Sequence, residues 1–344
     1  DSRTMSLPPS EIPLGAIRFN SDSQKLEYWN GEAWFQVKTF SPTLEGGARG
    51  VFSGGDPSRD TNMDYITIAT RGNGTDFGDF PISNGTGNRG IIGSNTRGFC
   101  NGGESPSAGD SHNVIGKWEF TSTGSAIDFA NLTFTSKGGP GLSNATRAVQ
   151  ARGYGAPSIT HEDVCFFTMA SQQDAVDFGD LISGSSYGGS GIASPTRGVI
   201  ITARSASVNF VNNIEYVTIA TTGSFNDFGD VTNIDNADFT ATAGNSTRGV
   251  LAGGQDSPNT QTEISYVTYA TTGNTIKFGD LHTANSYAAA VSDSVTMITG
   301  GGQGATNRMD AINIATGGTS VDSGDLTVSK TTMTGSSNGH GGLG

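Results

Sequence analysis

Two charged residue types recur through the chain at intervals of about 50 residues, and their chemistry could support catalysis or metal binding. A guanidinium can hold an anion, and carboxylates can act as acids, bases or metal ligands. However, a reaction needs one asymmetric cluster, whereas these residues recur in nearly every repeat. We therefore predict that their side chains bond neighbouring strand ends or adjacent repeats. They are Arg49, Arg97, Arg147, Arg197, Arg248, Asp79, Asp180, Asp230, Asp280 and Asp325.

The remaining chemical motifs are weak. "GTGNRG" at 85–90 matches a dinucleotide fingerprint by letters, but it joins two predicted strands and no helix follows. The histidines form no pair spaced for zinc, and "DSH" at 110–112 and "HED" at 161–163 are too compact in sequence to make a triad by themselves. We predict a non-enzymatic protein with no catalytic residue, metal or cofactor. "SHN" could still meet partners from other loops, so a hydrolase remains open.

Composition excludes several classes of protein. Net charge is −13 and no Lys or Arg block accumulates, which argues against nucleic acid as a partner. The longest apolar runs, such as "AAAV" at 288–291, are too short to cross a bilayer, and no retained signal peptide is expected. The two cysteines, Cys100 and Cys165, lie in predicted strands and are expected to be buried and inert.

A repeat supplies the elements that must position these residues. The phrase "FGD" and its variants recur in "DFGDF" at 76, "DFANL" at 128, "DFGDL" at 177, "DFGDV" at 227, "KFGDL" at 277 and "DSGDL" at 322. Upstream of each phrase lie an alternating strand such as "YVTIAT", a segment such as "TRGVLAGG" and a Gly- and Ala-rich stretch. Each repeat thus predicts a meander of four strands, with the quoted phrase as the fourth.

Six such units predict an all-β fold, a six-bladed β-propeller with four-stranded blades over residues 41–344. The small residues of the predicted first strands suit the centre of a propeller, where strands from all the blades approach one another closely. The first unit lacks a clear first strand, while the chain ends in "KTTMTGSSNGHGGLG". We therefore expect residues 330–339 to supply that strand and close blade 1.

Residues 1–40 lie outside the repeat. Within them, "GAIRFN", "KLEYWN" and "AWFQV" alternate like strands, and Asn30-Gly31 is a hairpin signal. The three segments span residues 12–37, and about 26 residues bury little surface alone. The aromatic side chains there must therefore pack on something. We predict a small N-terminal β-hairpin module used for attachment or oligomerisation, although it could instead fold back onto the propeller.

The two ends of the meanders differ in sequence. The turns between first and second strands ("SNTRG", "SPTRG") and between third and fourth strands hardly vary, and we call that end the uniform face. The other connections vary in length and form the variable face, where binding groups normally lie. Candidate ligand residues there are Arg59, Asp60, His112, Tyr154, His161, Tyr187, Phe210 and Asn212.

"VFSGG", "VLAGG" and "MITGG", each followed by an aromatic strand, resemble kelch-type propeller repeats. The longer "TRGVLAGG…YVTYATTGNTIKFGDL" resembles repeats of bacteriophage tail and fibre proteins, especially those of cyanophages, and "GAIRFN…LEYWNG…W" resembles a module of phage virion proteins.

The resemblance implies a virion location. It also implies other virion proteins as partners through the N-terminal segment, a possible homo-oligomer, and a host receptor or glycan as ligand. A carbohydrate-active propeller enzyme and a purely structural virion spacer are the alternatives.

Overall fold

The computed structural model describes residues 12–20, 25–37, 47–57, 59, 61–81, 87–104, 111–155, 161–182, 187–203, 211–232, 238–256 and 259–344. The chain divides into two compact units, residues 1–43 and 44–344. The described residues are all-β apart from one short 3-10 helix, η2 (Gly341–Leu343). None of them forms a helix that is long and apolar enough to span a membrane.

The first unit is an antiparallel sheet of three strands, β1 (Ile17–Asn20), β2 (Lys25–Trp29) and β3 (Trp34–Gln36), in the order β1-β2-β3. The Asn-Gly turn joins β2 to β3: Gly31 has φ +102°, and the Asn30 Oδ1 accepts bonds from the backbone N–H groups of Glu32 and Ala33 at 2.9 and 2.8 Å. The turn residues thus set the register that pairs Trp29 with Trp34.

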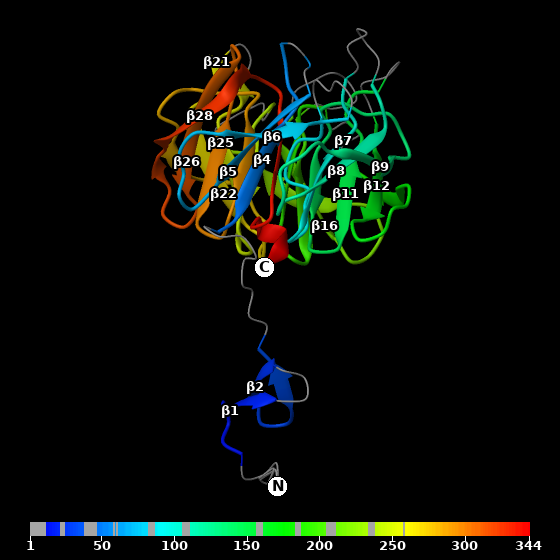
Figure 1. Cartoon of the computed structure of the whole chain (residues 1–344), viewed down its shortest axis with the longest axis vertical. Helices are drawn as coiled ribbons and strands as arrows, with labels where there is room; N and C mark the ends of the chain where they lie inside the picture. Colours follow the sequence, from blue (N-terminus) through cyan, green and yellow to red (C-terminus); the bar gives the residue numbers. More distant parts are fainter. Residues whose placement is uncertain are drawn as a thin grey trace. The chain divides into compact units, whose positions relative to one another are not determined.

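The described part of the second unit contains six antiparallel sheets of three or more strands, which we number first to sixth along the chain (Figure 1). Five have the predicted four strands in meander order, while the fifth also pairs in parallel with the short β27 (Gly318–Thr319). The second has three strands, because its first segment makes only an isolated bridge, Gly93 to Gly98.

The strands are as follows. First sheet: β29 (Thr334–Ser337), β4 (Arg49–Ser53), β5 (Asn62–Thr67), β6 (Thr75–Asp79); second: β7 (Arg97–Asn101), β8 (Val114–Glu119), β9 (Ile127–Asn131); third: β10 (Gly141–Ser143), β11 (Arg147–Ala151), β12 (Asp163–Thr168), β13 (Val176–Asp180). Fourth: β14 (Ser190–Ala193), β15 (Arg197–Ile201), β16 (Asn213–Thr218), β17 (Asn226–Asp230); fifth: β18 (Ala241–Gly244), β19 (Arg248–Ala252), β22 (Glu263–Thr268), β23 (Ile276–Asp280); sixth: β24 (Ala289–Ser292), β25 (Thr296–Gly300), β26 (Thr306–Asn313), β28 (Val321–Lys330). A separate ribbon joins β20 (Gln255–Asp256) to β21 (Asn259–Thr260).

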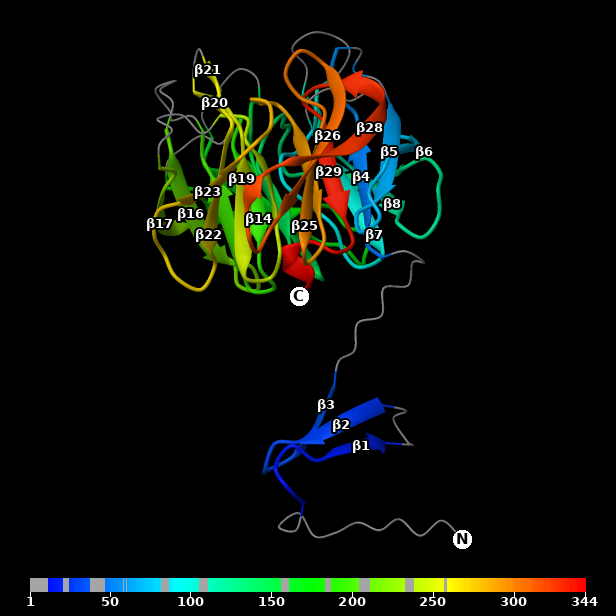
Figure 2. The same ribbon diagram turned by 90° about the vertical axis from the view of Figure 1, so that its left-hand side faces the viewer.

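The C-terminal strand pairs with the beginning of the second unit, as the sequence predicts. β29 runs antiparallel to β4, with Thr334 opposite Ser53 and Ser337 opposite Gly50 (Figure 2). The Ser336 and Ser337 side chains are fully buried, and their hydroxyls donate to the carbonyls of Ile92 and Ser292 at 2.6 and 2.8 Å. The last strand therefore completes the first sheet and bonds both neighbouring sheets.

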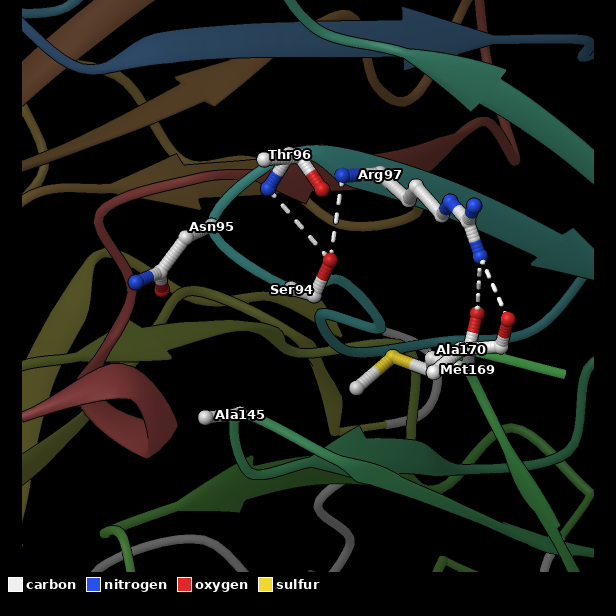
Figure 3. A pocket seen from close by; sticks show the side chains of 7 residues that line it. All are labelled: Ser94, Asn95, Thr96, Arg97, Ala145, Met169 and Ala170. Carbon is white, nitrogen blue, oxygen red and sulfur yellow. Dashed lines mark hydrogen bonds between the residues drawn. The ribbon is translucent and has the colours of Figure 1, made fainter. Parts of the chain in front are cut away.

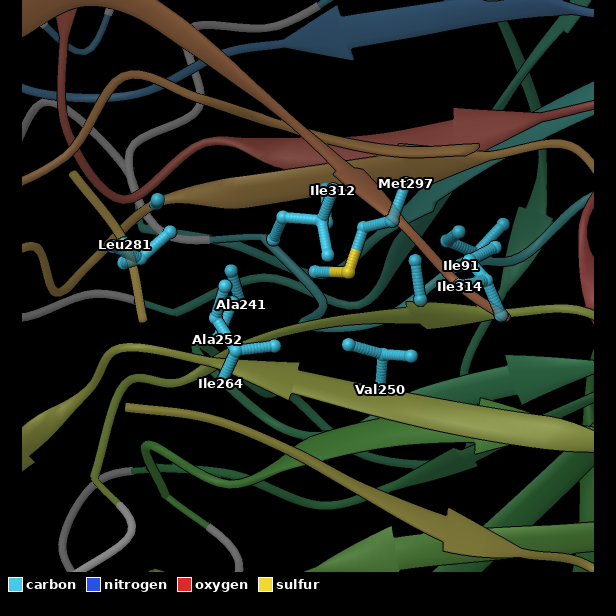
Figure 4. Packing of buried hydrophobic residues seen from close by; sticks show 12 residues of the cluster. Ile91, Ala241, Val250, Ala252, Ile264, Leu281, Met297, Ile312 and Ile314 are labelled. Carbon is cyan, nitrogen blue, oxygen red and sulfur yellow. The ribbon is translucent and has the colours of Figure 1, made fainter. Parts of the chain in front are cut away.

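Six buried clusters hold the sheets face to face, one at each junction between consecutive sheets and one between the sixth sheet and the first. Figure 4 shows the junction of the fifth and sixth sheets, where Val250 and Ile264 face Met297 and Ile312. At the last junction Phe52 and Ile66 of the first sheet pack with Val291 and Ile298 of the sixth. Both buried cysteines, Cys100 and Cys165, belong to these clusters and are not joined in a disulfide.

The recurring "FGD" phrase holds shape. Between third and fourth strands the register shifts at the phrase: Met63 faces Gly78, but Asp64 faces Asp76, so Phe77 is the extra residue of a β-bulge. The bulge accompanies a positive φ at the phrase glycine, which is +139° at Gly78. This brings the strand against the turn of the next sheet, where Gly124 N–H donates to the Phe77 carbonyl at 2.7 Å. A side chain at Gly78 would place its Cβ 2.6 Å from the Gly124 carbonyl carbon.

The same glycine-to-glycine contact recurs at other junctions, including Gly179 with Gly223, Gly229 with Gly273, and Gly324 with Gly72. Between the second and third sheets both glycines are missing, since Ala130 and Gln173 stand there. At that junction the Asp174 carboxylate accepts a bond from Asn131 N–H at 2.9 Å, as the Asn274 and Asn73 side chains do from the equivalent residues at two other junctions. A shallow surface groove lined by Ala130 and Gln173 opens there. The "DFANL" variant of the second sheet and the glycine-free turn of the third sheet thus lie opposite each other at the same contact between sheets.

Candidate functional site

The repeated arginines form one kind of contact. Each lies at the start of a second strand and donates from its guanidinium to a carbonyl just after the third strand of the next sheet. Four of them also stack on an aromatic ring of their own sheet, with guanidinium-to-centroid distances of 4.0 to 4.5 Å. The donor and acceptor pairs are Arg49 to Phe120, Arg97 to Met169, Arg147 to Ile219, Arg197 to Tyr269, and Arg248 to Ile314.

The repeated aspartates connect sheets through their backbone instead. Asp230 N–H donates to the Asn274 Oδ1 at 3.0 Å and its carbonyl accepts from Thr275 N–H at 3.0 Å, while Asp325 does the same with Asn73 and Gly74. The carboxylate of Asp79 stays within its own sheet, where it accepts from the Thr61 hydroxyl at 2.9 Å. Among the described residues, the repeated arginines and aspartates form no ion pairs with each other.

A groove of about 360 Å³ lies on the uniform face, and Figure 3 shows the residues that line it: Ser94, Asn95, Thr96, Arg97, Ala145, Met169 and Ala170. Its one charged side chain, Arg97, already donates to the carbonyls of Met169 and Ala170 at 2.8 and 3.0 Å and pairs with Glu119 at 3.2 Å. Because these bonds hold the guanidinium against the protein, the groove offers little chemistry to a ligand.

The variable face carries a different arrangement. Four aromatic rings lie in a continuous series from the third to the sixth sheet, and we call them the aromatic arc: Tyr154, Tyr187, Phe239 and Tyr287. Tyr154 and Tyr187 meet edge to face at 5.9 Å, Tyr187 and Phe239 at 5.7 Å, and Phe239 stacks on Tyr287 at 3.9 Å. The three tyrosines are partly exposed, whereas Phe239 is buried between two of them.

The backbone beneath the arc is unusual. Five equivalent residues precede the first strands of their sheets, and all have a positive φ, between 56° and 79°. Each of the last four donates its N–H to the carbonyl of its predecessor at 2.9 to 3.1 Å. A left-handed backbone at a residue with a side chain costs on the order of 1–2 kcal/mol, and this hydrogen-bonded series offsets that cost. The residues are Gly138, Gly188, Phe239, Tyr287 and Thr332.

A buried arginine lies next to the arc. Arg89 is 4% exposed, its guanidinium lies 5.0 Å from the Phe239 ring centroid, and its Nη2 donates to the carbonyls of Thr240 and Ala288 at 3.4 and 3.3 Å. Its Nε and Nη1 have no hydrogen-bond partner. Burial lowers the pKa of Arg89 to about 10, against the opposing charge of Asp238, so the side chain remains cationic at neutral pH.

Charged side chains border the arc at the third sheet. The Lys137 ammonium lies 4.7 Å from the Tyr154 ring centroid and 2.9 Å from Glu104 Oε1, which also pairs with Arg59 at 3.3 Å. Tyr287 donates its hydroxyl to Gln255 at 2.8 Å at the other end of the arc. The arrangement therefore combines aromatic faces with hydrogen-bonding and charged groups, which suits an uncharged polar ligand with C–H surfaces.

Only part of the predicted ligand set meets here. Tyr154 and Tyr187 belong to the arc, and Arg59 reaches it through Glu104. His161 instead contacts the Gly155 carbonyl at 3.1 Å, and Asn212 donates to the Val231 carbonyl at 3.0 Å, a contact that secures a strand end. Asp60 and Phe210 lie outside the described residues.

His112 is a partly buried histidine whose two ring nitrogens are both inaccessible to solvent. Its two ring nitrogens have no hydrogen-bond partner, and burial lowers its pKa to about 4.

The sequence reasoning missed Arg89, Asp238, Phe239 and Tyr287. Arg89 falls inside "GTGNRG", which has no meaning as a dinucleotide motif. A usable signal was present, because Tyr187, Phe239 and Tyr287 recur at intervals of 52 and 48 residues immediately before small first strands.

A second histidine, His340, lies near the opposite end of the first strands of the sheets. His340 is 4% exposed, its Nε2 lies 2.9 Å from the Gly93 carbonyl oxygen, and its Nδ1 accepts from Gly342 N–H at 3.2 Å. The cavity beside it measures about 10 Å³, which is room for about one water molecule. Burial lowers the pKa of His340 to about 4, although the bond to Gly93 opposes the shift.

The described residues contain no group of three His, Cys, Asp or Glu side chains that could hold a metal ion. No protein-family model matches the sequence. A search of curated proteins also finds no match.

Proposed function

We propose that residues 44–344 form a closed six-bladed β-propeller. Three observations support closure: the buried cluster between the sixth and first sheets, the contact of Gly324 with Gly72 across the same junction, and the pairing of β29 with β4. The consecutive contacts among β10, β14, β18, β24 and β29 agree with innermost strands around a common axis.

We further propose that the protein is a non-enzymatic, kelch-like virion protein of a bacteriophage, a tail, fibre or vertex component whose variable face binds a glycan on the host surface. The aromatic arc is the observation that carries the binding role. Partly exposed tyrosine rings can stack on the C–H faces of a sugar, while Lys137, Gln255 and the tyrosine hydroxyls can bond its hydroxyl groups. The virion assignment rests on the sequence resemblance.

The carboxylates near the arc support binding over catalysis. Glu104 is held between two cations, Arg59 and Lys137, and Asp163 pairs with Arg152 at 3.2 Å. A glycosidase needs two carboxyl groups that face each other across a sugar bond. Carboxylates engaged with cations favour a structural role.

A glycan array with the full chain tests the binding role. We expect a defined set of glycans to be retained, and Tyr154→Ala and Tyr187→Ala to weaken their binding at least tenfold each. Ile127→Ala is the matched control, because Ile127 is an exposed apolar residue on the outer strand β9, far in sequence from the arc. Unchanged binding in a Tyr154→Ala/Tyr187→Ala double variant contradicts the proposal.

A further inference from the structure

The three-stranded sheet of the first unit has two unlike faces. Cross-strand pairing places Ile17, Tyr28 and Phe35 in one row and Phe19 and Leu26 in the next, all on the same side. The exposed fractions are 66% for Ile17, 66% for Phe19, 40% for Leu26, 40% for Tyr28 and 47% for Phe35. We call these five side chains the apolar face.

On the opposite side of this sheet, the tryptophan and charged side chains contact one another within the unit. Trp29 is 5% exposed and packs on Trp34 at a centroid distance of 5.5 Å. Arg18 stacks over Trp34 at 4.1 Å and pairs with Glu27 at 2.8 Å. The side with charges and tryptophans thus has internal partners, while the apolar face stays at least 40% exposed at every residue although the Tyr28 and Phe35 rings meet at 5.9 Å.

We propose that the apolar face packs against the same face of a second copy of this chain. Two such sheets would stack face to face at about 10 Å, with interdigitated side chains, as in a small β-sandwich. Since the described apolar face contains no charged residue, two identical faces match each other about a two-fold axis. This inference deepens the attachment or oligomerisation role that the sequence predicts for residues 1–40, and it is independent of glycan binding.

The area fits a dimer. Side chains of this size carry on the order of 200 Å² each, so the observed exposed fractions leave about 500 Å² on each copy. Pairing two copies would bury about 1,000 Å², which is at the lower limit for a specific interface. A three-stranded sheet of this length is also marginal alone, because it has too little core, and a second sheet supplies one.

The described part of the second unit offers no matching patch. Its exposed large apolar residues include Ile127, Val176 and Ile276, each at the start of the fourth strand of a different sheet. Single apolar residues of this kind are ordinary on protein surfaces. The net charge of −13 makes two chains repel over the rest of their surfaces, which favours association through an uncharged face.

Sedimentation or light scattering of the full chain at micromolar concentration tests the inference. We expect a mass of two chains, and a mass of one chain for Phe19→Asp and for Tyr28→Asp. Ile127→Asp is the matched control and should leave the mass at two chains. A one-chain mass for the unchanged protein overturns the proposal, and so does a two-chain mass that survives both aspartate substitutions.

An aspartate variant could lose the dimer because it fails to fold. A crosslinking variant therefore tests the same interface without introducing a charge. Both native cysteines are buried, so Tyr28→Cys introduces an accessible thiol at the centre of the apolar face. Mild oxidation should give a disulfide-linked pair of chains, whereas Ile127→Cys should not. Failure of Tyr28→Cys to crosslink, with the thiol protected inside a single chain, would mean that the face packs on its own second unit. Glycan binding is also measured on Phe19→Asp. Loss of the dimer can then be told apart from failure of the proposed glycan binding.

Discussion

The arginines of the uniform face and the arginine beside the variable face differ in how fully their guanidinium groups are hydrogen-bonded. On the uniform face, Arg248 donates to the carbonyls of Ile314 and Ala315 and lies 4.0 Å from the Tyr266 centroid. On the variable face, Arg89 makes two long bonds and keeps two nitrogens without a partner. The repeated arginine belongs to the scaffold, whereas the single one lies beside the aromatic arc. In a repeat protein, departures from the repeat are where a ligand site is best sought.

The largest effect is expected where sheet meets sheet at glycine. Gly179→Val should lower the free energy of unfolding by about 3 kcal/mol or more, because the residue has φ +143° and its Cβ would lie 2.5 Å from the Gly223 carbonyl carbon. Chemical denaturation measures the change. Ala130→Gly is the control at the junction that lacks this contact, and it should cost less than about 1 kcal/mol. Equal losses in the two variants contradict the assignment.

Acidification should weaken the packing around His340. Its pKa is about 4 in the folded chain and 6.5 as the reference value, so the unfolded chain binds the extra proton between these pH values. Stability is therefore complete above pH 6.5 and falls as the pH is lowered toward 4, by roughly 3 kcal/mol at most for this group.

Urea unfolding at pH 7, 6, 5 and 4 measures this loss. His340→Gln should flatten the profile in that window, even though the variant loses native bonds and is less stable at pH 7. Parallel profiles for the two proteins would show that His340 does not titrate as described.

Removal of one repeated guanidinium should have an intermediate effect. Arg248→Met loses two charge-assisted bonds and the stacking on Tyr266, so we expect a loss of about 2 kcal/mol in the free energy of unfolding. Arg71→Gln, an exposed control, should change it by less than about 0.5 kcal/mol. An equal change in the free energy of unfolding in the two variants would contradict the structural role of the repeated arginines.

The smallest effect on stability is expected in the arc. Tyr187→Ala loses two edge-to-face contacts of a partly exposed ring, which should cost about 1 kcal/mol. Glycan affinity, measured by calorimetry on a ligand found by the array, should fall at least tenfold. A large loss of stability with unchanged affinity would make the arc part of the scaffold.

Much of the scaffold was predictable because its signals are local and repeated. The period of the "FGD" phrase located the fourth strands, the Asn30-Gly31 turn located a hairpin, and the orphan C-terminal segment indicated the partner of β4. The repeated arginines were assigned to structure on symmetry alone, and their carbonyl partners agree with that role. The repeated aspartates were harder, because their contacts between sheets run through backbone atoms that any residue could supply.

The sequence by itself determined the strand pattern, the number of repeats and the residues that recur, since alternation, turn chemistry and period are properties of neighbours along the chain. Only the tertiary structure decided which irregular residues meet. Tyr154, Tyr187, Phe239 and Tyr287 come from four different repeats, and Arg89 from a fifth. Their proximity depends on how the first strands of the sheets pack on one another. Distances across packed sheets are set by backbone contacts between repeats and leave no local pattern in the residues themselves.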